Sequence, residues 1–165
     1  MDYPTFWEDL KSGKFASMVK DTSEGQVLKS SREAANILIP LVATHDDVEV
    51  FYGVFLNTSN RILGIDALST GSISSASVYP REIIKRALAL KASTLILAHN
   101  HPSGNTAPSD EDRLLTTHIL TVMIAMGIGV LDHIIISNQS YFSFGDDGWL
   151  PREKIRLKQL LGETK

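Results

Sequence analysis

The apolar residues of this chain follow two different patterns that alternate along its length. Nearly continuous apolar runs at 48–56, 94–98 and 130–137 have the length and the β-branched and aromatic content of buried strands. The segments that begin at Pro80 and Ser109 instead repeat apolar residues every three to four positions, as amphipathic helices do. This alternation of strands and helices predicts an α/β protein.

Short polar turns follow two of the strand-like runs. Residues 57–60, which read Asn-Thr-Ser-Asn, separate the first run from a second strand at 61–68. Residues 138–139 separate the run at 130–137 from a short partner strand. Tight turns join antiparallel strands, whereas strands connected through a helix are parallel. We therefore expect a mixed β-sheet flanked by helices on both faces.

Capping residues mark the helix ends. Ser30 or Ser31 can cap a helix that runs to about Val42, with Glu33 as a capping-box partner. The helix that begins at Ser109 is predicted to be long and to end near Gly127 and Gly129. Its residues predicted to face the core are Leu115, Ile119, Val122 and Met126. A last helix is expected at 151–161.

Composition indicates one domain. A chain of 165 residues, 43% of them hydrophobic, is large enough for a single globular core. We assign residues 29–165 to this domain, including the C-terminal helix. Residues 1–28 form an N-terminal segment of uncertain structure with scattered aromatic side chains. These aromatic groups offer a surface for a second copy, so a homodimer is one expectation.

The chain contains no cysteine, which excludes disulfides, cysteine zinc sites and thiol catalysis and is consistent with a reducing compartment. The N-terminus lacks the basic and apolar regions of a signal peptide, and no apolar run is long enough to span a membrane. We therefore expect a cytoplasmic protein without a membrane partner.

The net charge of −3 argues against a general nucleic-acid binder, which more often carries a basic face. Basic side chains do cluster at 81–91 and at 152–158. We interpret both clusters as solvated helix faces.

The strongest chemical signal is His99-Asn100-His101 at the end of the run at 94–98. Side chains alternate along a strand, so both imidazoles should lie on one side and Asn100 should point away from them. We interpret Asn100 as a residue that stabilises the loop. Asp112 is far enough along the chain for a turn and a helix start to bring its carboxylate back. Two imidazoles and one carboxylate suit zinc with an open fourth position, which a catalytic metal needs.

Ser109 and Asp112 also have a simpler interpretation. Ser109 can be the N-cap of the long helix, with Asp112 as the acidic residue at its third position. The two interpretations are compatible, because a capping geometry would also fix the direction in which Asp112 points.

The spacing His-x-His, seven residues, then Ser-x-x-Asp matches the metal signature of the JAMM (MPN-plus) family. The longer string HNHPSGNTAPSDED, with VYPREI before it and LDHIII after it, resembles the RadC family of bacterial JAMM proteins over about residues 30–147. The resemblance implies a cytidine-deaminase-like architecture with one zinc ion held by His99, His101 and Asp112.

The resemblance also implies two catalytic residues. Glu49 matches the glutamate that acts as general base, and the hydroxyl of Ser109 would help to hold an oxyanion. Considered alone, Glu49 is an ordinary solvated carboxylate at a strand end. Glu82 is a rival base, although an acid in the first turn of a helix also complements the helix dipole. We interpret His118 as structural, and His133 as structural or as a support for the site.

Two functions are therefore considered. The JAMM resemblance implies a zinc metallopeptidase-type hydrolase that cleaves peptide or isopeptide bonds in a peptide or protein substrate. The alternative is a DNA-repair-associated factor of the RadC type with a non-peptidase role. The acidic chain disfavours DNA, and the hairpin glycines of a helix-hairpin-helix region are missing. A zinc deaminase is excluded because it needs a Cys-x-x-Cys pair.

Overall fold

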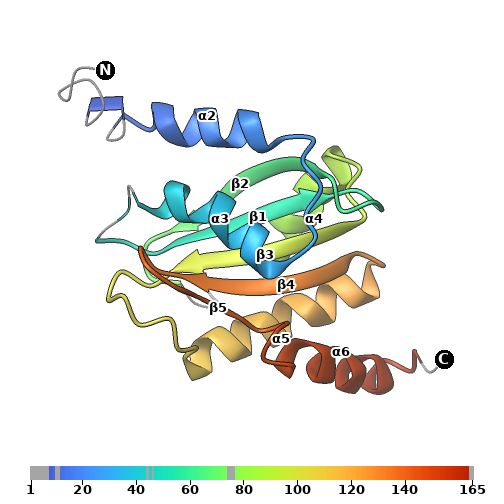
Figure 1. Cartoon of the computed structure of the whole chain (residues 1–165). Helices are drawn as coiled ribbons and strands as arrows, with labels where there is room; N and C mark the ends of the chain where they lie inside the picture. Colours follow the sequence, from blue (N-terminus) through green and yellow to red (C-terminus); the bar gives the residue numbers. More distant parts are fainter. Residues whose placement is uncertain (1–7, 10–11, 44, 46, 74–76, 164–165) are drawn as a thin grey trace.

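The computed structural model describes residues 8–9, 12–43, 45, 47–73 and 77–163. In these ranges the chain forms a five-stranded sheet with strand order β2-β1-β3-β4-β5 and helices on both faces (Figure 1). The strands are β1 (Val50–Leu56), β2 (Ile62–Thr70), β3 (Thr94–Asn100), β4 (Gly129–Ile136) and β5 (Tyr141–Ser143). The helices are α2 (Lys14–Ser23), α3 (Ser31–Val42), α4 (Pro80–Ala89), α5 (Asp110–Ala125) and α6 (Trp149–Leu160).

The sheet is mixed, as the turns predict. β3 and β4 are parallel and are connected through α5, whereas β1 pairs antiparallel with both β2 and β3. The turn between β1 and β2 is held by Asn57, whose Oδ1 accepts hydrogen bonds from the backbone N–H groups of Ser59 and Arg61. Asn60 in this turn has a φ of 56°, a left-handed conformation that asparagine tolerates better than most residues.

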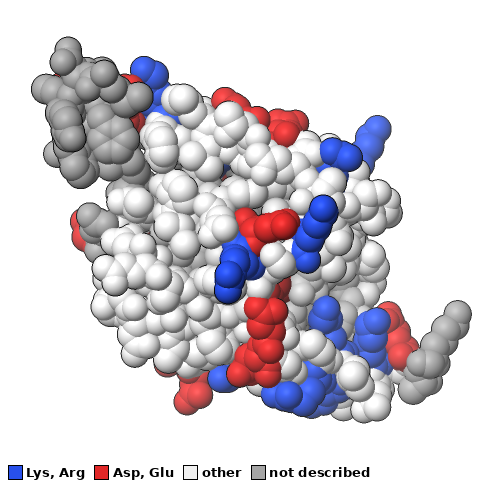
Figure 2. Space-filling model, in the orientation of Figure 1, with Lys and Arg blue, Asp and Glu red and all other residues white. Residues whose placement is uncertain are grey.

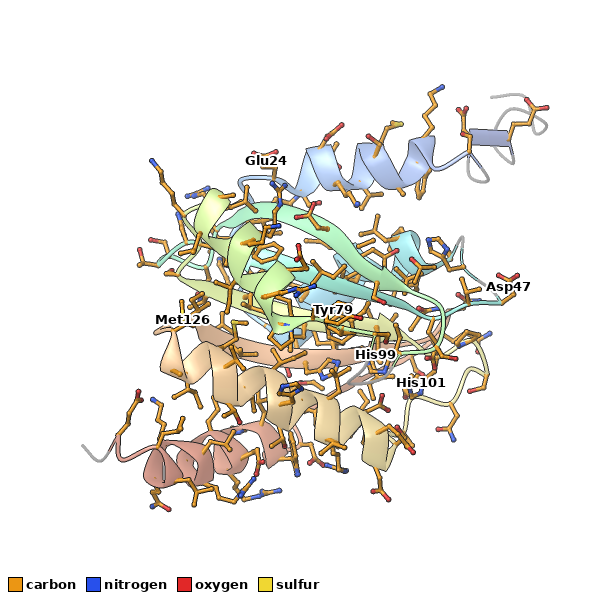
Figure 3. The ribbon with its side chains drawn as sticks, turned by 180° about the vertical axis from the view of Figure 1, so that it is seen from behind. Glu24, Asp47, Tyr79, His99, His101 and Met126 are labelled. Atoms are coloured by element: carbon orange, nitrogen blue, oxygen red, sulfur yellow. The ribbon has the colours of Figure 1, made fainter. Side chains whose placement is uncertain are left out.

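Each face of the sheet has its own apolar core. α3 covers one face, with α2 beside it, while α4 and α5 cover the other face and α6 packs next to α5 (Figures 1 and 3). Every residue of β1 is buried, because the strand lies inside the sheet and helices cover both of its faces. No helix in the described ranges has the length and apolar character needed to cross a bilayer.

The helix starts largely agree with the sequence. The side chain of Ser30 caps α3 by accepting a hydrogen bond from Glu33 N, and Pro80 is the first residue of α4. The last helix begins at Trp149, two residues before the predicted start. α2 lies within the N-terminal segment of residues 1–28, whose structure the sequence left uncertain.

The predicted apolar stripe of α5 was partly wrong. Leu115 and Ile119 are buried as expected, but the stripe continues through Met123 rather than Val122. Met126 is 50% exposed because α5 ends at Ala125, so Met126 is the C-cap and lies beyond the packed face. The observed row keeps a spacing of four residues, which turns the helix slightly relative to the predicted stripe.

The strand register brings three distant segments together at one end of the inner strands β1 and β3. Phe51 near the start of β1 pairs with His99 near the end of β3, because these two strands are antiparallel. α5 begins ten residues after β3 ends and returns along the same face. The start of β1, the end of β3 and the first turn of α5 therefore meet.

Candidate metal centre

The side chains of His99, His101 and Asp112 converge at this end of the strands (Figure 3 labels the two histidines). His99 Nε2 lies 3.0 Å from His101 Nε2 and 3.0 Å from Asp112 Oδ1, and His101 Nε2 lies 3.3 Å from Asp112 Oδ2. Donor atoms at about 2.0–2.1 Å from a tetrahedral zinc ion lie about 3.3 Å from one another. The spacing of these three donors therefore fits a tetrahedral metal with one position left open.

The nitrogen that His99 offers is set by a buried chain of hydrogen bonds. The hydroxyl of Thr116 donates to the carbonyl oxygen of Asp112 at 2.5 Å, so it can only accept from His133 Nδ1, 2.6 Å away. His133 then carries its proton on Nδ1, and its Nε2 accepts from His99 Nδ1 at 2.9 Å. The lone pair of His99 Nε2 is left for a metal.

His133 is suited to this place because it is fully buried between two aromatic rings. It stacks on Phe144 with ring centroids 5.1 Å apart, and Phe51 meets it edge-on at 5.5 Å. Burial lowers the pKa of His133 well below its usual value, so the imidazole is neutral and its Nε2 can accept a hydrogen bond from His99 Nδ1.

His101 is oriented by a backbone carbonyl. Its Nδ1 lies 2.8 Å from the carbonyl oxygen of Asn105, and a carbonyl can only accept, so Nδ1 is the protonated nitrogen. His101 Nε2 therefore also faces the candidate metal position. The hydrogen bond with Asp112 raises the pKa of His101 despite its partial burial, and the negative charge of Glu49 acts in the same direction.

Asp112 serves the helix and the candidate site together. Its backbone N–H donates to Ser109 Oγ at 3.1 Å, and its Oδ2 accepts from Ser109 N at 2.8 Å, which completes a capping box. Burial favours a raised pKa for Asp112, but the neighbouring imidazoles of His101 and His99, when they carry a proton on Nε2 in the metal-free site, outweigh it and hold the pKa below the usual range. The carboxylate is therefore ionised and aimed at the imidazoles.

Glu49 directly precedes β1 and lies on the metal side of the sheet. Side chains alternate along a strand, so Glu49 shares a face with Phe51, which stacks on His99 with centroids 6.0 Å apart. Glu49 Oε2 accepts a hydrogen bond from Ile73 N at 2.9 Å. The rival Glu82 instead pairs with Arg81 and Lys85 in half-exposed ion pairs on α4.

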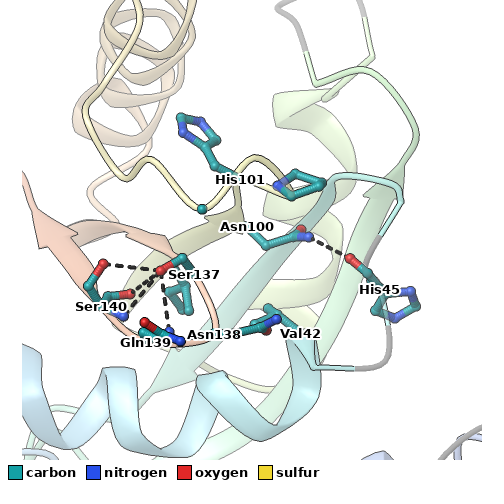
Figure 4. Close-up of a pocket in the computed structure, with 11 residues that line it drawn as sticks. Val42, His45, Asn100, His101, Ser137, Asn138, Gln139 and Ser140 are labelled. Carbon is teal, nitrogen blue, oxygen red and sulfur yellow. Dashed lines mark hydrogen bonds between the residues drawn. The ribbon is translucent and has the colours of Figure 1, made fainter.

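A cavity lies beside the donor cluster, and His101 is one of the residues that line it. It has a volume of about 590 Å³ and is lined by Asn100, Ser137 and Ser140 among others (Figure 4). Asn100 faces this cavity side of the sheet, whereas the ring of His101 points away from Ser137 and Ser140 (Figure 4). His45 lines this cavity and His118 is exposed on α5, and neither lies within the cluster of His99, His101 and Asp112.

A mixed sheet between helices, with a His-His-Asp cluster at the end of β3, defines a domain of the JAB/MPN class. Residues 28–149 match the sequence family described as "RadC-like JAB domain". The chain therefore belongs to the RadC family, as its motif indicates.

The chain is similar to bacterial proteins that are named "UPF0758 protein". The chain is 43% identical over 134 residues to a "UPF0758 protein" of Thiobacillus denitrificans (strain ATCC 25259 / T1). This match covers 81% of the chain and 59% of the relative. It is 41% identical over 133 residues to a "UPF0758 protein" of Pseudomonas fluorescens (strain SBW25), again covering 81% and 59%. The matched region thus spans less than two thirds of these relatives.

Proposed function

We propose that this chain is a zinc-dependent hydrolase that cleaves peptide or isopeptide bonds in a peptide or protein substrate. The observation that carries the proposal is the convergence of His99, His101 and Asp112, with Glu49 on the same face of the sheet. A bound zinc ion would supply a Lewis acid and lower the pKa of a water molecule at its open position to about 7.

Glu49 is the proposed general base. Its Oε2 is held by Ile73 N, which fixes the carboxylate near the start of β1 on the same side as the ligands. A carboxylate in this place can take a proton from water and pass it to the leaving amine. Such transfers contribute about 100-fold or more to a rate.

Ser109 is the proposed oxyanion donor. Its Oγ already accepts a hydrogen bond from Asp112 N, so its own proton is available to a second acceptor. Ser109 is exposed, so this proton can reach the carbonyl oxygen of a substrate. A hydroxyl donor aimed at a developing negative charge lowers the barrier to attack on a carbonyl.

The test measures metal content and hydrolysis together. Protein purified without chelator, and then offered zinc, should hold one zinc per chain by elemental analysis. It should cleave a mixture of fluorogenic unstructured peptides or their lysine-linked isopeptide analogues, and a chelator should abolish the cleavage. Absence of any bound transition metal after zinc is offered would overturn the proposal.

Two variants separate binding from chemistry. His99→Ala should lose zinc and remain folded, because His99 lies near the carboxyl end of β3 and its removal leaves the apolar residues of both cores in place, although its side chain is fully buried. Glu49→Gln should keep zinc and lose about 100-fold or more in turnover. Glu82→Gln is the matched control and should be active. Loss of zinc with Glu49→Gln would make Glu49 a ligand, and full activity would make another carboxylate the base.

A further inference from the structure

Asn100 lies between the two histidine donors but faces the opposite side of the sheet. Its side chain is 3% exposed and makes three hydrogen bonds. Oδ1 accepts from Val50 N at 2.6 Å, while Nδ2 donates to the carbonyl oxygens of Val48 at 2.9 Å and His45 at 3.1 Å (Figure 4 shows the bond to His45). These bonds use both protons of the amide nitrogen.

Two of these partners flank Glu49. Val48 O and Val50 N belong to the peptide groups on either side of the proposed base. The side-chain amide of Asn100 therefore holds the backbone before and after Glu49, and we call its three hydrogen bonds the Asn100 clamp. The regular pairing of β1 with β3 reaches only to Phe51 and His99. Beyond that pair, on the side toward β3, the Asn100 side chain takes the place of backbone ladder bonds.

The other side of Glu49 is held by the segment after β2. Glu49 O accepts from Gly71 N at 2.9 Å, and Glu49 Oε2 accepts from Ile73 N at 2.9 Å. These two bonds tie Glu49 to the segment after β2, but neither ties it to the metal ligands. Among the hydrogen bonds of Val48, Glu49 and Val50 to other described residues, those to the His-x-His segment are made by the Asn100 side chain.

We propose that Asn100 is a positioning residue that sets the distance between the Glu49 carboxylate and the metal ligands. The inference rests on the proposed role of Glu49. The backbone of Asn100 lies between the two imidazoles, and its side chain holds the backbone of the base, so one residue joins both parts of the site. A general base must lie within hydrogen-bond reach of its proton, and a displacement of about 1 Å can cost 100-fold.

Asn100→Asp is the sharpest test, because it keeps the shape and removes both Nδ2 donors. The carbonyls of Val48 and His45 would then face a carboxylate oxygen instead of an N–H donor. We expect the variant to keep one zinc per chain and an unchanged Co²⁺ absorption spectrum, since the three donors are untouched. Turnover should fall about 10- to 100-fold with little change in KM.

Two readouts distinguish positioning from a general structural role. Hydrogen exchange followed by mass spectrometry should speed up in residues 47–50 and stay unchanged in α6, which packs next to α5 on the opposite face of the sheet from the Asn100 side chain. In a Glu49→Gln background, Asn100→Asp should cause no further loss of turnover, because the group it positions is gone.

Asn138→Asp is the matched control. It makes the same chemical change at an exposed residue that lines the same cavity, and we expect it to change none of these readouts. If Asn100→Asp does not fold, Asn100→Ser removes the same donors with a smaller side chain and should give the same pattern.

The outcomes that would overturn the inference are distinct from failure of the proposed function. Loss of zinc in Asn100→Asp, or an equal loss of turnover with and without Glu49, would show that Asn100 does not act through Glu49. Unchanged exchange in residues 47–50 would show that the Asn100 clamp does not hold this segment. The exchange and zinc measurements need no substrate, so they decide the clamp even if no peptide is cleaved.

Discussion

His133 Nε2 lies 2.9 Å from His99 Nδ1, so a fully buried and neutral histidine accepts the hydrogen bond that orients the candidate ligand His99. Thr116 in turn orients His133, and Thr116 bonds the backbone of Asp112. Two of the three donors are thus connected through a closed set of hydrogen bonds that contains no solvent-exposed group.

Replacing His133 should therefore weaken metal binding without removing a ligand. His133→Leu keeps a similar volume but leaves the Nδ1 proton of His99 without its acceptor. Loss of such a supporting partner typically costs 10- to 100-fold in metal affinity, and we expect that range in a zinc competition titration with a chromophoric chelator. His118→Leu, at an exposed position on α5, should bind zinc as the unaltered protein does. Equal affinities in both variants would refute the tautomer argument.

Ser109 should show two separable effects. Ser109→Ala removes the N-cap of α5, which should lower the free energy of unfolding by about 1 kcal/mol in chemical denaturation. It should also reduce turnover roughly 100-fold if its hydroxyl holds an oxyanion. Ser30→Ala removes the corresponding cap of α3 and should cost similar stability without loss of turnover. A parallel fall in turnover for both variants would assign the effect to stability alone.

Zinc affinity should depend on pH. The hydrogen bond to Asp112 raises the pKa of His101, so a proton occupies the metal-free site at higher pH than it would on an isolated histidine. Asp112, whose pKa is lowered, stays ionised in this window and contributes no competing proton. Apparent affinity should weaken as pH falls from about 8 to about 6, approaching tenfold per unit below the pKa of His101. A flat profile from the chelator titration would contradict this assignment.

DNA binding should be weak. Figure 2 shows Lys and Arg side chains beside Asp and Glu near the centre of the face drawn, while further basic side chains gather at the lower right, over α6. Several basic groups are paired, including Arg86 with Asp66 and Arg156 with Glu153. We therefore expect affinity for duplex and single-stranded DNA no tighter than micromolar at about 150 mM salt. Tighter binding with a steep salt dependence would favour the repair-factor alternative, and charge reversal at Arg81, Lys85 and Arg86 would then locate the contact.

Local sequence signals predicted much of the fold and the donor cluster. The apolar runs and short turns were sufficient for the mixed sheet, and the strand end at His99 with the cap at Ser109 was sufficient to bring Asp112 back. The supporting bonds were not predictable in the same way. Thr116 contacts His133 because α5 packs against β4, and the spacing of apolar residues along the sequence does not predict that contact. Likewise, Asn100 was correctly expected to point away from the imidazoles, but its partners around Glu49 depend on strand register.

The capping box of α5 holds Asp112 through Ser109, so the position of Asp112 does not depend on the side chains of residues 102–108. His101 is anchored by its N–H bond to Ile136 O and by the carbonyl of Asn105, a backbone group that any residue type supplies. Asp112 is anchored by Ser109. This loop can therefore change in sequence, and lengthen after Asn105, while the three candidate donors stay in place. A fixed set of donors can thus be surrounded by a variable surface.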